Sequence, residues 1–188
     1  MAAMKKKLVI VGDSSCGKTR LLFTISRGRY VDDEVRLAFQ DYEAEITIEE
    51  KLMKFDLVDT PGLEDYDLIR TLSYEDTDIV LVCFAVDNQD SLSNISKKWI
   101  LEVEKYCPGV PVILVGNKKD LRDFGEADNR PNLVNPEEGM LLAEKIGAHS
   151  YLECSAKTFD GVHQVFDTAA RLTLQFPKNV AVKRINDD

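Results

Sequence analysis

A stretch near the start of the chain has the residue types and spacing of a phosphate-binding loop. Residues 12–19 read GDSSCGKT, which fits the pattern G-x-x-x-x-G-K-[ST], and they follow an apolar run at residues 8–11. Phosphate oxygens need several converging donors, and glycine lets the backbone turn its N–H groups inward without a Cβ in the way. A helix that begins here adds its positive end. The segment therefore predicts a nucleotide-phosphate site rather than a glycine turn that binds nothing.

Two side chains of this loop have specific predicted tasks. Lys18 places a cation near the β- and γ-phosphates, and the Thr19 hydroxyl is suited to ligate Mg²⁺. We predict that the loop binds phosphate and metal through Gly12, Asp13, Ser14, Ser15, Cys16, Gly17, Lys18 and Thr19.

A second motif, DTPG at residues 59–62, follows a predicted strand. Asp59 is placed to hold Mg²⁺ through water beside Thr19, and the Gly62 N–H is placed to reach a γ-phosphate. Alone, such a motif is usually a turn. After a phosphate-binding loop, the two motifs converge on one metal, so we predict that both are functional.

Two further motifs point to the base. In NKKD at residues 117–120, the Asp120 carboxylate can accept N–H bonds from guanine N1 and N2, and adenine offers neither donor. Lys118 can lie over the base, and Asn117 can tie this segment to the phosphate loop. The SAK segment, Ser155, Ala156 and Lys157, is placed to offer a backbone N–H to guanine O6. Together the motifs predict a guanine nucleotide.

Short apolar runs alternate with amphipathic stretches along the whole chain, which predicts an α/β fold with a mostly parallel sheet and helices on both faces. Several runs are continuously apolar, as expected of strands buried on both faces, whereas residues 42–48 alternate like an edge strand. Asp90 and Asp160 stand where helix N-caps are expected. Residues 48–51 are predicted to form a hairpin turn. The expected strands are residues 7–11, 42–48, 51–59, 79–86, 112–117 and 150–154.

Length and composition limit the classes of protein. The 188 residues fit one domain, and a net charge of −9 argues against a nucleic-acid partner, because phosphate backbones require Lys/Arg patches. The four cysteines lack C-x-x-C spacing and mostly lie in apolar runs, so we expect reduced, buried thiols. No apolar run approaches the roughly 18 residues needed to span a bilayer. We therefore expect a cytoplasmic monomer.

With these motifs in place, the chain resembles small GTPases of the Ras superfamily, and most closely the Rho family. The resemblance covers about residues 4–175 and implies the P-loop NTPase, small G-protein fold with a six-stranded sheet. It implies one G domain over residues 1–178, with a flexible tail at 179–188. The segments that carry it are residues 64–67, 72–78, 98–99, 107–108, 116–122, 136–139 and 153–158.

The Rho resemblance also implies a function and partners. It implies a molecular switch that binds GTP or GDP with Mg²⁺ and signals to effectors, for example formins or kinases, in regulation of the actin cytoskeleton. Exchange factors, GTPase-activating proteins and a dissociation inhibitor are the implied regulators. Family members usually end in a basic stretch with a prenylated cysteine, and this chain ends KRINDD. A place at the inner face of the plasma membrane is expected only if a lipidated tail was trimmed.

The chain departs from the family at positions that matter for catalysis. The resemblance assigns catalytic roles to Lys18, Gly62 and the residue at position 63, where the family's water-orienting glutamine is replaced by Leu63. Ser14 replaces a glycine and crowds the γ-phosphate. GTP hydrolysis is therefore expected to be slow. One alternative is a constitutively GTP-bound pseudoenzyme that acts as an effector-binding module. A small-molecule kinase is disfavoured, since it has no use for the NKKD motif.

The first loop expected to sense the γ-phosphate also departs from the family. Leu37 stands where a threonine normally closes over Mg²⁺, and Glu34 adds a charge that repels a triphosphate. We therefore expect this loop to stay open with GTP bound. Tyr30 stands where an aromatic residue flanks the guanine, and a tyrosine can serve there.

Overall fold

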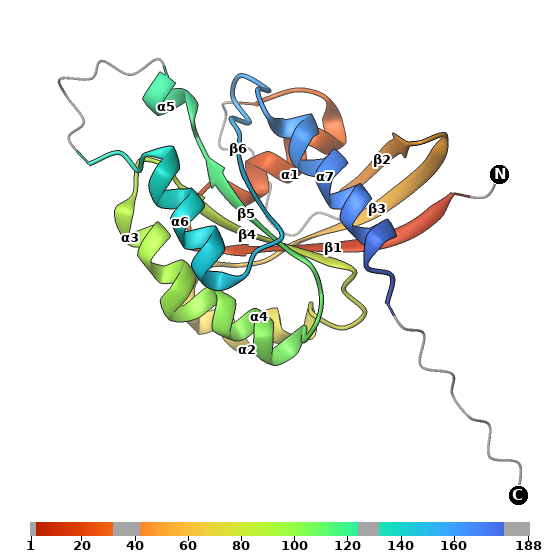
Figure 1. Ribbon diagram of the computed structural model, residues 1–188, viewed down its shortest axis with the longest axis horizontal. Coiled ribbons are helices and arrows are strands. Elements are labelled where there is room, and N and C mark those ends of the chain that lie inside the picture. The colour runs from red at the N-terminus through yellow and green to blue at the C-terminus, as the bar shows by residue number, and fades with distance from the viewer. Residues whose placement is uncertain (1–2, 32–41, 124–131, 179–188) are drawn as a thin grey trace, which may run out of the picture.

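The structure is a computed structural model that describes residues 3–31, 42–123 and 132–178. Over these residues six strands form one sheet in the order β2-β3-β1-β4-β5-β6 (Figure 1). Only the β2–β3 pair is antiparallel, and the other neighbours run parallel. The strands are β1 (Met4–Gly12), β2 (Tyr42–Ile48), β3 (Lys51–Asp59), β4 (Ile79–Ala85), β5 (Val112–Asn117) and β6 (Ser150–Glu153). The predicted strands and the mostly parallel sheet are confirmed, with small shifts at strand ends.

Helices cover both faces of the sheet, as predicted for a parallel α/β fold (Figure 1). A 3₁₀ turn at Glu64–Tyr66 precedes α2, and a π-helical turn at Ile95–Trp99 joins α3 to α4. The α-helices are α1 (Lys18–Arg27), α2 (Asp67–Leu72), α3 (Gln89–Asn94), α4 (Ile100–Tyr106), α5 (Asp120–Asp123), α6 (Pro136–Ile146) and α7 (Val162–Gln175). None of the helices in the described residues is long and apolar enough to cross a membrane.

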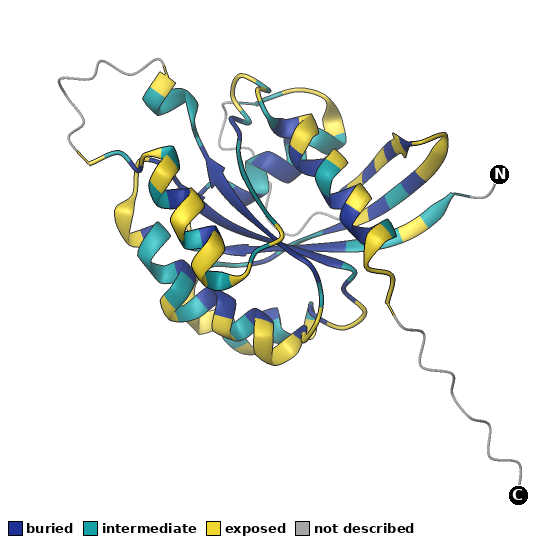
Figure 2. Ribbon diagram, in the orientation of Figure 1, coloured by how far each residue is buried: buried dark blue, intermediate teal, exposed yellow. Residues whose placement is uncertain are grey.

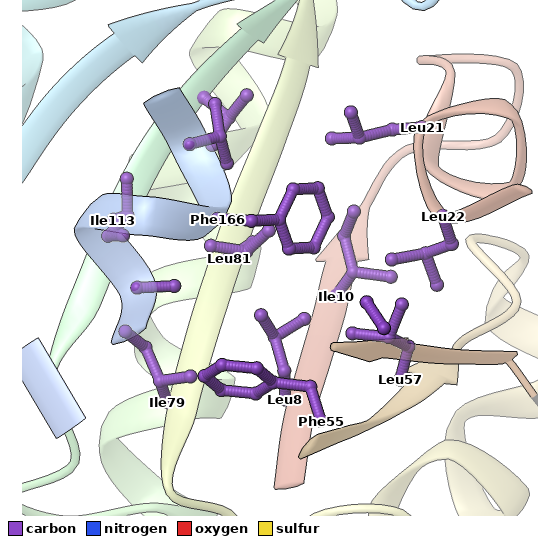
Figure 3. Close-up of a cluster of buried hydrophobic side chains, with 14 of the residues drawn as sticks. Leu8, Ile10, Leu21, Leu22, Phe55, Leu57, Ile79, Leu81, Ile113 and Phe166 are labelled. Atoms are coloured by element: carbon purple, nitrogen blue, oxygen red, sulfur yellow. The ribbon is translucent and has the colours of Figure 1, made fainter. Parts of the chain in front are cut away.

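Side-chain alternation along the strands divides the core into two layers. On one face Leu8 and Ile10 pack with Leu21 and Leu22 of α1 and with Phe166 of α7, as Figure 3 shows. On the other face, a second cluster forms beneath α4 and α6. Figure 2 shows buried residues through the centre of the sheet and exposed residues on the outer sides of the helices. Hydrophobic side chains thus pack on both faces of the sheet, and this packing fixes the positions of the strand ends.

Two predicted caps are wrong, although the helices they preceded are present. Asn88, not Asp90, caps α3, and its side chain accepts from the Ser91 N–H. The helix α7 begins after Gly161, which has φ 72° and leaves no room for a side chain, because a Cβ there would lie 2.3 Å from the Glu153 carbonyl oxygen. The observed cap of α3 is thus two residues before Asp90, and that of α7 is one residue after Asp160.

Other local predictions are confirmed. Glu49 and Glu50 adopt φ 52° and 63°, the signs that a two-residue type I′ hairpin turn requires. The edge strand β2 alternates between buried and exposed residues along its whole length. All four cysteines are buried and unbridged. The sequence of residues 123–135 is rich in Asp, Asn, Gly and Pro, which predicts a surface loop, and residues 124–131 lie outside the described residues.

Candidate functional site

The predicted motifs meet at the carboxyl ends of the parallel strands. The phosphate loop follows β1, the DTPG motif follows β3, the NKKD motif begins at the last residue of β5, and the SAK segment follows β6. Strand register aligns these ends, since Ile10 pairs with Asp59 and Ala85 pairs with Asn117. Ligands of open parallel sheets bind at this edge. The sheet therefore brings together four motifs that are spread over more than a hundred residues of sequence.

The phosphate loop has the backbone geometry of an anion-binding turn. Gly12 and Gly17 adopt φ 148° and 98°, and Ser15 adopts φ 62°. A Cβ at Gly12 would lie 2.2 Å from the Cys83 carbonyl oxygen, so only glycine fits there. Gly17 caps α1 without a side-chain hydrogen bond. The start of α1 therefore keeps its N–H groups toward the loop, as a phosphate site requires.

Lys18 is fixed over this loop. Its ammonium donates to the carbonyl oxygens of Gly12 and Asp13, each at 2.8 Å, and the residue is 6% exposed. Two of its three donor positions are thus held by the backbone of the loop. Among the described residues nothing accepts from the third position, which is suited to a phosphate oxygen.

The predicted metal ligands are adjacent. The Thr19 hydroxyl donates to Asp59 Oδ2 at 2.5 Å, whereas the buried Asp59 Oδ1 has no hydrogen-bond partner among the residues that the structure describes. Burial raises the pKa of Asp59 despite the Thr19 hydrogen bond and the nearby Lys18 charge. A buried carboxylate with an unused oxygen is suited to a cation, and Mg²⁺ takes few protein ligands beside phosphate oxygens and water. The residues present therefore fit Mg²⁺.

A compact pocket of about 190 Å³ joins the metal ligands to the phosphate loop and the DTPG motif. At its edge Gly62 packs against the phosphate loop, where a Cβ would lie 2.4 Å from the Ser14 nitrogen. Ser14 itself is exposed on the loop. The pocket is lined by Ser14, Lys18, Thr19, Asp59, Thr60, Pro61 and Gly62.

Replacing Asp59 with asparagine is expected to weaken Mg²⁺ binding by the nucleotide-loaded protein about 10–100-fold, the usual cost of losing an outer-sphere carboxylate. The measurement is the rate of GDP release as free Mg²⁺ is lowered with a buffered chelator. Asp56→Asn is the matched control, because Asp56 is exposed on the same strand. An unchanged Mg²⁺ midpoint in Asp59→Asn would contradict the assignment of Asp59 to the metal.

Most of the residues predicted to recognise the base line a second pocket of about 230 Å³. Asn117 is 3% exposed and donates to the Cys16 carbonyl oxygen at 2.9 Å, which confirms the predicted link between the NKKD motif and the phosphate loop. Asp120 Oδ1 accepts from the Ser155 hydroxyl at 2.6 Å. The pocket is lined by Gly17, Arg20, Tyr30, Asn117, Lys118, Asp120, Leu121, Ala156 and Lys157.

The three residues of the SAK segment do not all line this second pocket. Ala156 and Lys157 line the pocket, whereas Ser155 is fully buried and does not. The Ser155 N–H already donates to the Asp160 carbonyl oxygen, and its hydroxyl orients the Asp120 carboxylate. Ser155 thus orients Asp120 and does not itself line the pocket.

A model of the Ras family matches residues 7–175. This chain belongs to the Ras family. As a Ras-family protein with the small G-protein P-loop fold, it is a GTP-binding molecular switch. One pocket adjoins the motifs predicted to bind the phosphates and Mg²⁺, and the other adjoins the motifs predicted to bind the base.

In this Ras-family protein, Leu63 faces solvent; it is the residue at the position where a water-orienting glutamine is expected. Leu63 directly follows Gly62 and is 54% exposed, so a substitution at this position removes no core packing. A leucine neither donates nor accepts a hydrogen bond. Leu37 and Glu34, which underlie the prediction of an open first loop, lie outside the described residues.

Sequence reasoning missed a buried cation that holds the DTPG segment. Arg70 of α2 is fully buried, and its guanidinium donates to the Pro61 carbonyl oxygen at 2.9 Å and to the Leu63 carbonyl oxygen at 3.4 Å. Glu102 accepts from Arg70 Nε at 2.6 Å and from Nη2 at 2.8 Å. The segment beside the γ-phosphate site is therefore fixed through Arg70 to α4.

The same network reaches the phosphate loop through the single tryptophan. The Arg70 guanidinium lies 4.8 Å from the centre of the Trp99 ring, and Trp99 Nε1 donates to Asp13 Oδ1 at 2.7 Å. Asn94 donates to the other oxygen of Asp13, also at 2.7 Å. The Asp13 side chain thus anchors the phosphate loop to Asn94 and to the π-helical turn before α4.

Replacing Glu102 with glutamine is expected to destabilise the fold by about 3 kcal/mol at neutral pH, because it leaves the Arg70 charge buried without its main partner. Burial alone would raise the pKa of Glu102, but hydrogen bonds from Arg70 and Tyr74 outweigh burial and lower it. Because the pKa of Glu102 is lower in the folded state than in the unfolded state, its ionised form stabilises the fold at pH values above the unfolded pKa of about 4.3. This stabilisation is lost as the pH falls through the pKa of the folded state. The difference between parent and variant should therefore vanish in acid.

Urea unfolding at a series of pH values measures this effect. Glu104→Gln is the matched control, because Glu104 is exposed on the same helix and should change stability little. A Glu102→Gln difference that stayed constant from pH 7 to pH 3 would show that the loss comes from packing and not from the charge pair.

Proposed function

We propose that this chain is a Rho-like guanine-nucleotide switch whose GTP hydrolysis is impaired by its own sequence. The observation that carries the proposal is the pocket that Asp120 lines, where a hydrogen bond from the Ser155 hydroxyl fixes the carboxylate that we predict to read guanine. The Rho-type segments of the sequence, such as residues 72–78 and 136–139, support the finer assignment.

The residues of the site have separate tasks in hydrolysis. Lys18 and the N–H groups of the phosphate loop bind the β- and γ-phosphates, and Gly62 brings its N–H toward the γ-phosphate. Thr19 and Asp59 would hold Mg²⁺, directly and through water, where the ion neutralises charge on the phosphates. The attacking water must approach in line with the bond that breaks. Leu63 gives that water no partner, so hydrolysis is slow.

A second function of a different class is a GTP-loaded pseudoenzyme that recruits effectors. Ser14 and Leu63 favour it, because one crowds the γ-phosphate and the other leaves the water unplaced. In either case, the proposed partners are exchange factors, GTPase-activating proteins, a dissociation inhibitor and effectors linked to the actin cytoskeleton. The proposed location is the cytoplasm, with the plasma membrane as the site of action for a lipidated form.

The nucleotide carried by the protein tests the proposal. We expect protein purified from cells in Mg²⁺ buffer, then denatured and analysed by ion-exchange chromatography, to release guanine nucleotide in roughly equal amount to protein. A large GTP fraction supports impaired hydrolysis, and complete occupancy by GTP favours the pseudoenzyme. Adenine nucleotide, or none, would overturn the proposed function. Asp120→Asn protein serves as the control, because its guanine content should fall.

A further inference from the structure

One wall of the base pocket is built from residues outside the recognised motifs. Arg20 and Tyr30 both line the pocket, and the Arg20 guanidinium lies 5.2 Å from the centre of the Tyr30 ring. Arg20 Nη1 also donates to the carbonyl oxygen of Val31. The Arg20 guanidinium therefore contacts both the Tyr30 ring, which lines the pocket, and the backbone of Val31.

Arg20 projects from a rigid support. It lies in the first turn of α1, next to Leu21 and Leu22, which are fully buried between α1 and the sheet (Figure 3). The segment with Tyr30 lies beyond the end of this helix, because α1 ends at Arg27 and Gly28 caps it with a left-handed φ of 65°. Arg20 thus connects the N-terminal turn of α1 to Tyr30 and Val31, which follow the C-terminal end of the same helix.

We propose that Arg20 is a positioning residue that fixes Tyr30 and Val31 as a wall of the base pocket and so slows release of the bound guanine nucleotide. The inference rests on the proposed function, since it assigns this pocket to the base. If the pocket wall is already ordered before the nucleotide binds, less conformational entropy is lost on binding. Differences in affinity of this kind appear mainly in the dissociation rate.

The chemistry of the two contacts requires arginine. A guanidinium is planar, so it can stack on an aromatic face while its N–H groups donate in the plane of the stack. A lysine ammonium is a point charge on a flexible stem and cannot make both contacts in one geometry. Arg20→Lys should therefore recover only part of the effect.

The test measures dissociation of radiolabelled GDP from the full chain in excess unlabelled GDP. We expect Arg20→Ala to release GDP about tenfold faster than the parent, the equivalent of one stacked cation and its hydrogen bond. Arg20→Lys should fall between the two. Arg27→Ala is the matched control, because Arg27 is exposed on the same helix and should leave the rate unchanged.

Two further readouts separate a pocket wall from a general loosening of α1. The Mg²⁺ concentration at which GDP release accelerates should be the same in Arg20→Ala and parent, since Thr19 and Asp59 are untouched. In a double-mutant cycle, Tyr30→Leu should speed release on its own, and Arg20→Ala should add little in its presence.

An Arg20→Ala rate within twofold of the parent, a shifted Mg²⁺ midpoint, or full additivity with Tyr30→Leu would overturn the inference alone. A parent chain that fails to retain GDP at all would overturn the proposed function and this inference with it.

Discussion

Replacing Asp120 with asparagine is expected to lower affinity for GDP and GTP by about 10²–10⁴-fold, because two hydrogen bonds to a charged acceptor are lost. Xanthine nucleotides should gain affinity, since xanthine presents a carbonyl where guanine has its 2-amino group, and the asparagine amide can donate to it. The parent should reject ATP by a similar or larger factor, because adenine leaves the carboxylate unpaired.

Competition of GTP, ATP and xanthosine triphosphate against a fluorescent guanine nucleotide measures the change. Asp123→Asn is the matched control, because it removes the same charge from the exposed end of the same short helix. Ser155→Ala should weaken guanine binding by a smaller factor, since it only frees the carboxylate to rotate. Equal binding of ATP and GTP by the parent would contradict the assignment of this pocket to guanine.

The sequence was sufficient to predict the parts of the site that depend on short-range patterns. Strand positions follow from apolar runs, and motifs at the ends of parallel strands must meet at one edge, so the meeting of Thr19 with Asp59 could be predicted. The link from Asn117 to the phosphate loop could be predicted for the same reason. Such predictions need only the order of the strands and the direction in which each one runs.

The residues that sequence reasoning missed act through contacts that no local pattern encodes. Arg70 reads as an ordinary cation on a short helix, and its burial depends on Glu102, 32 positions away. Asp13 lies in a motif that suggests phosphate contact, yet Trp99 holds its side chain from 86 positions away. The wrong cap assignments at Asp90 and Asp160 have another cause, because cap choice depends on the backbone path that enters the helix.

Hydrolysis of GTP by the parent chain is expected at or below about 10⁻⁴ s⁻¹, with little stimulation by a GTPase-activating domain of the Rho class. Leu63→Gln should raise the stimulated rate by at least about 10²-fold, because an arginine finger supplies up to about 10⁵-fold only when the water is also oriented. Leu63 is half exposed, so the change removes no core packing.

Single-turnover release of phosphate from preloaded GTP, with and without the activating domain, measures both rates. Leu68→Gln is the matched control: Leu68 is 85% exposed on α2, and the same substitution there orients no water. Protein stability and GTP loading should be equal in parent and both variants, so that a difference in rate reflects the chemical step.

Ser14 decides how far the rate can recover. Gly62 packs so closely on the loop that a Cβ would lie 2.4 Å from the Ser14 nitrogen, and we expect the exposed Ser14 side chain to crowd an incoming arginine finger. The double variant Ser14→Gly/Leu63→Gln should therefore exceed Leu63→Gln in the presence of the activating domain, and the gain should be much smaller without it. Rapid multiple turnover by the parent would show that another residue places the water. No gain in either variant would show that Ser14 and Leu63 are not what limits hydrolysis.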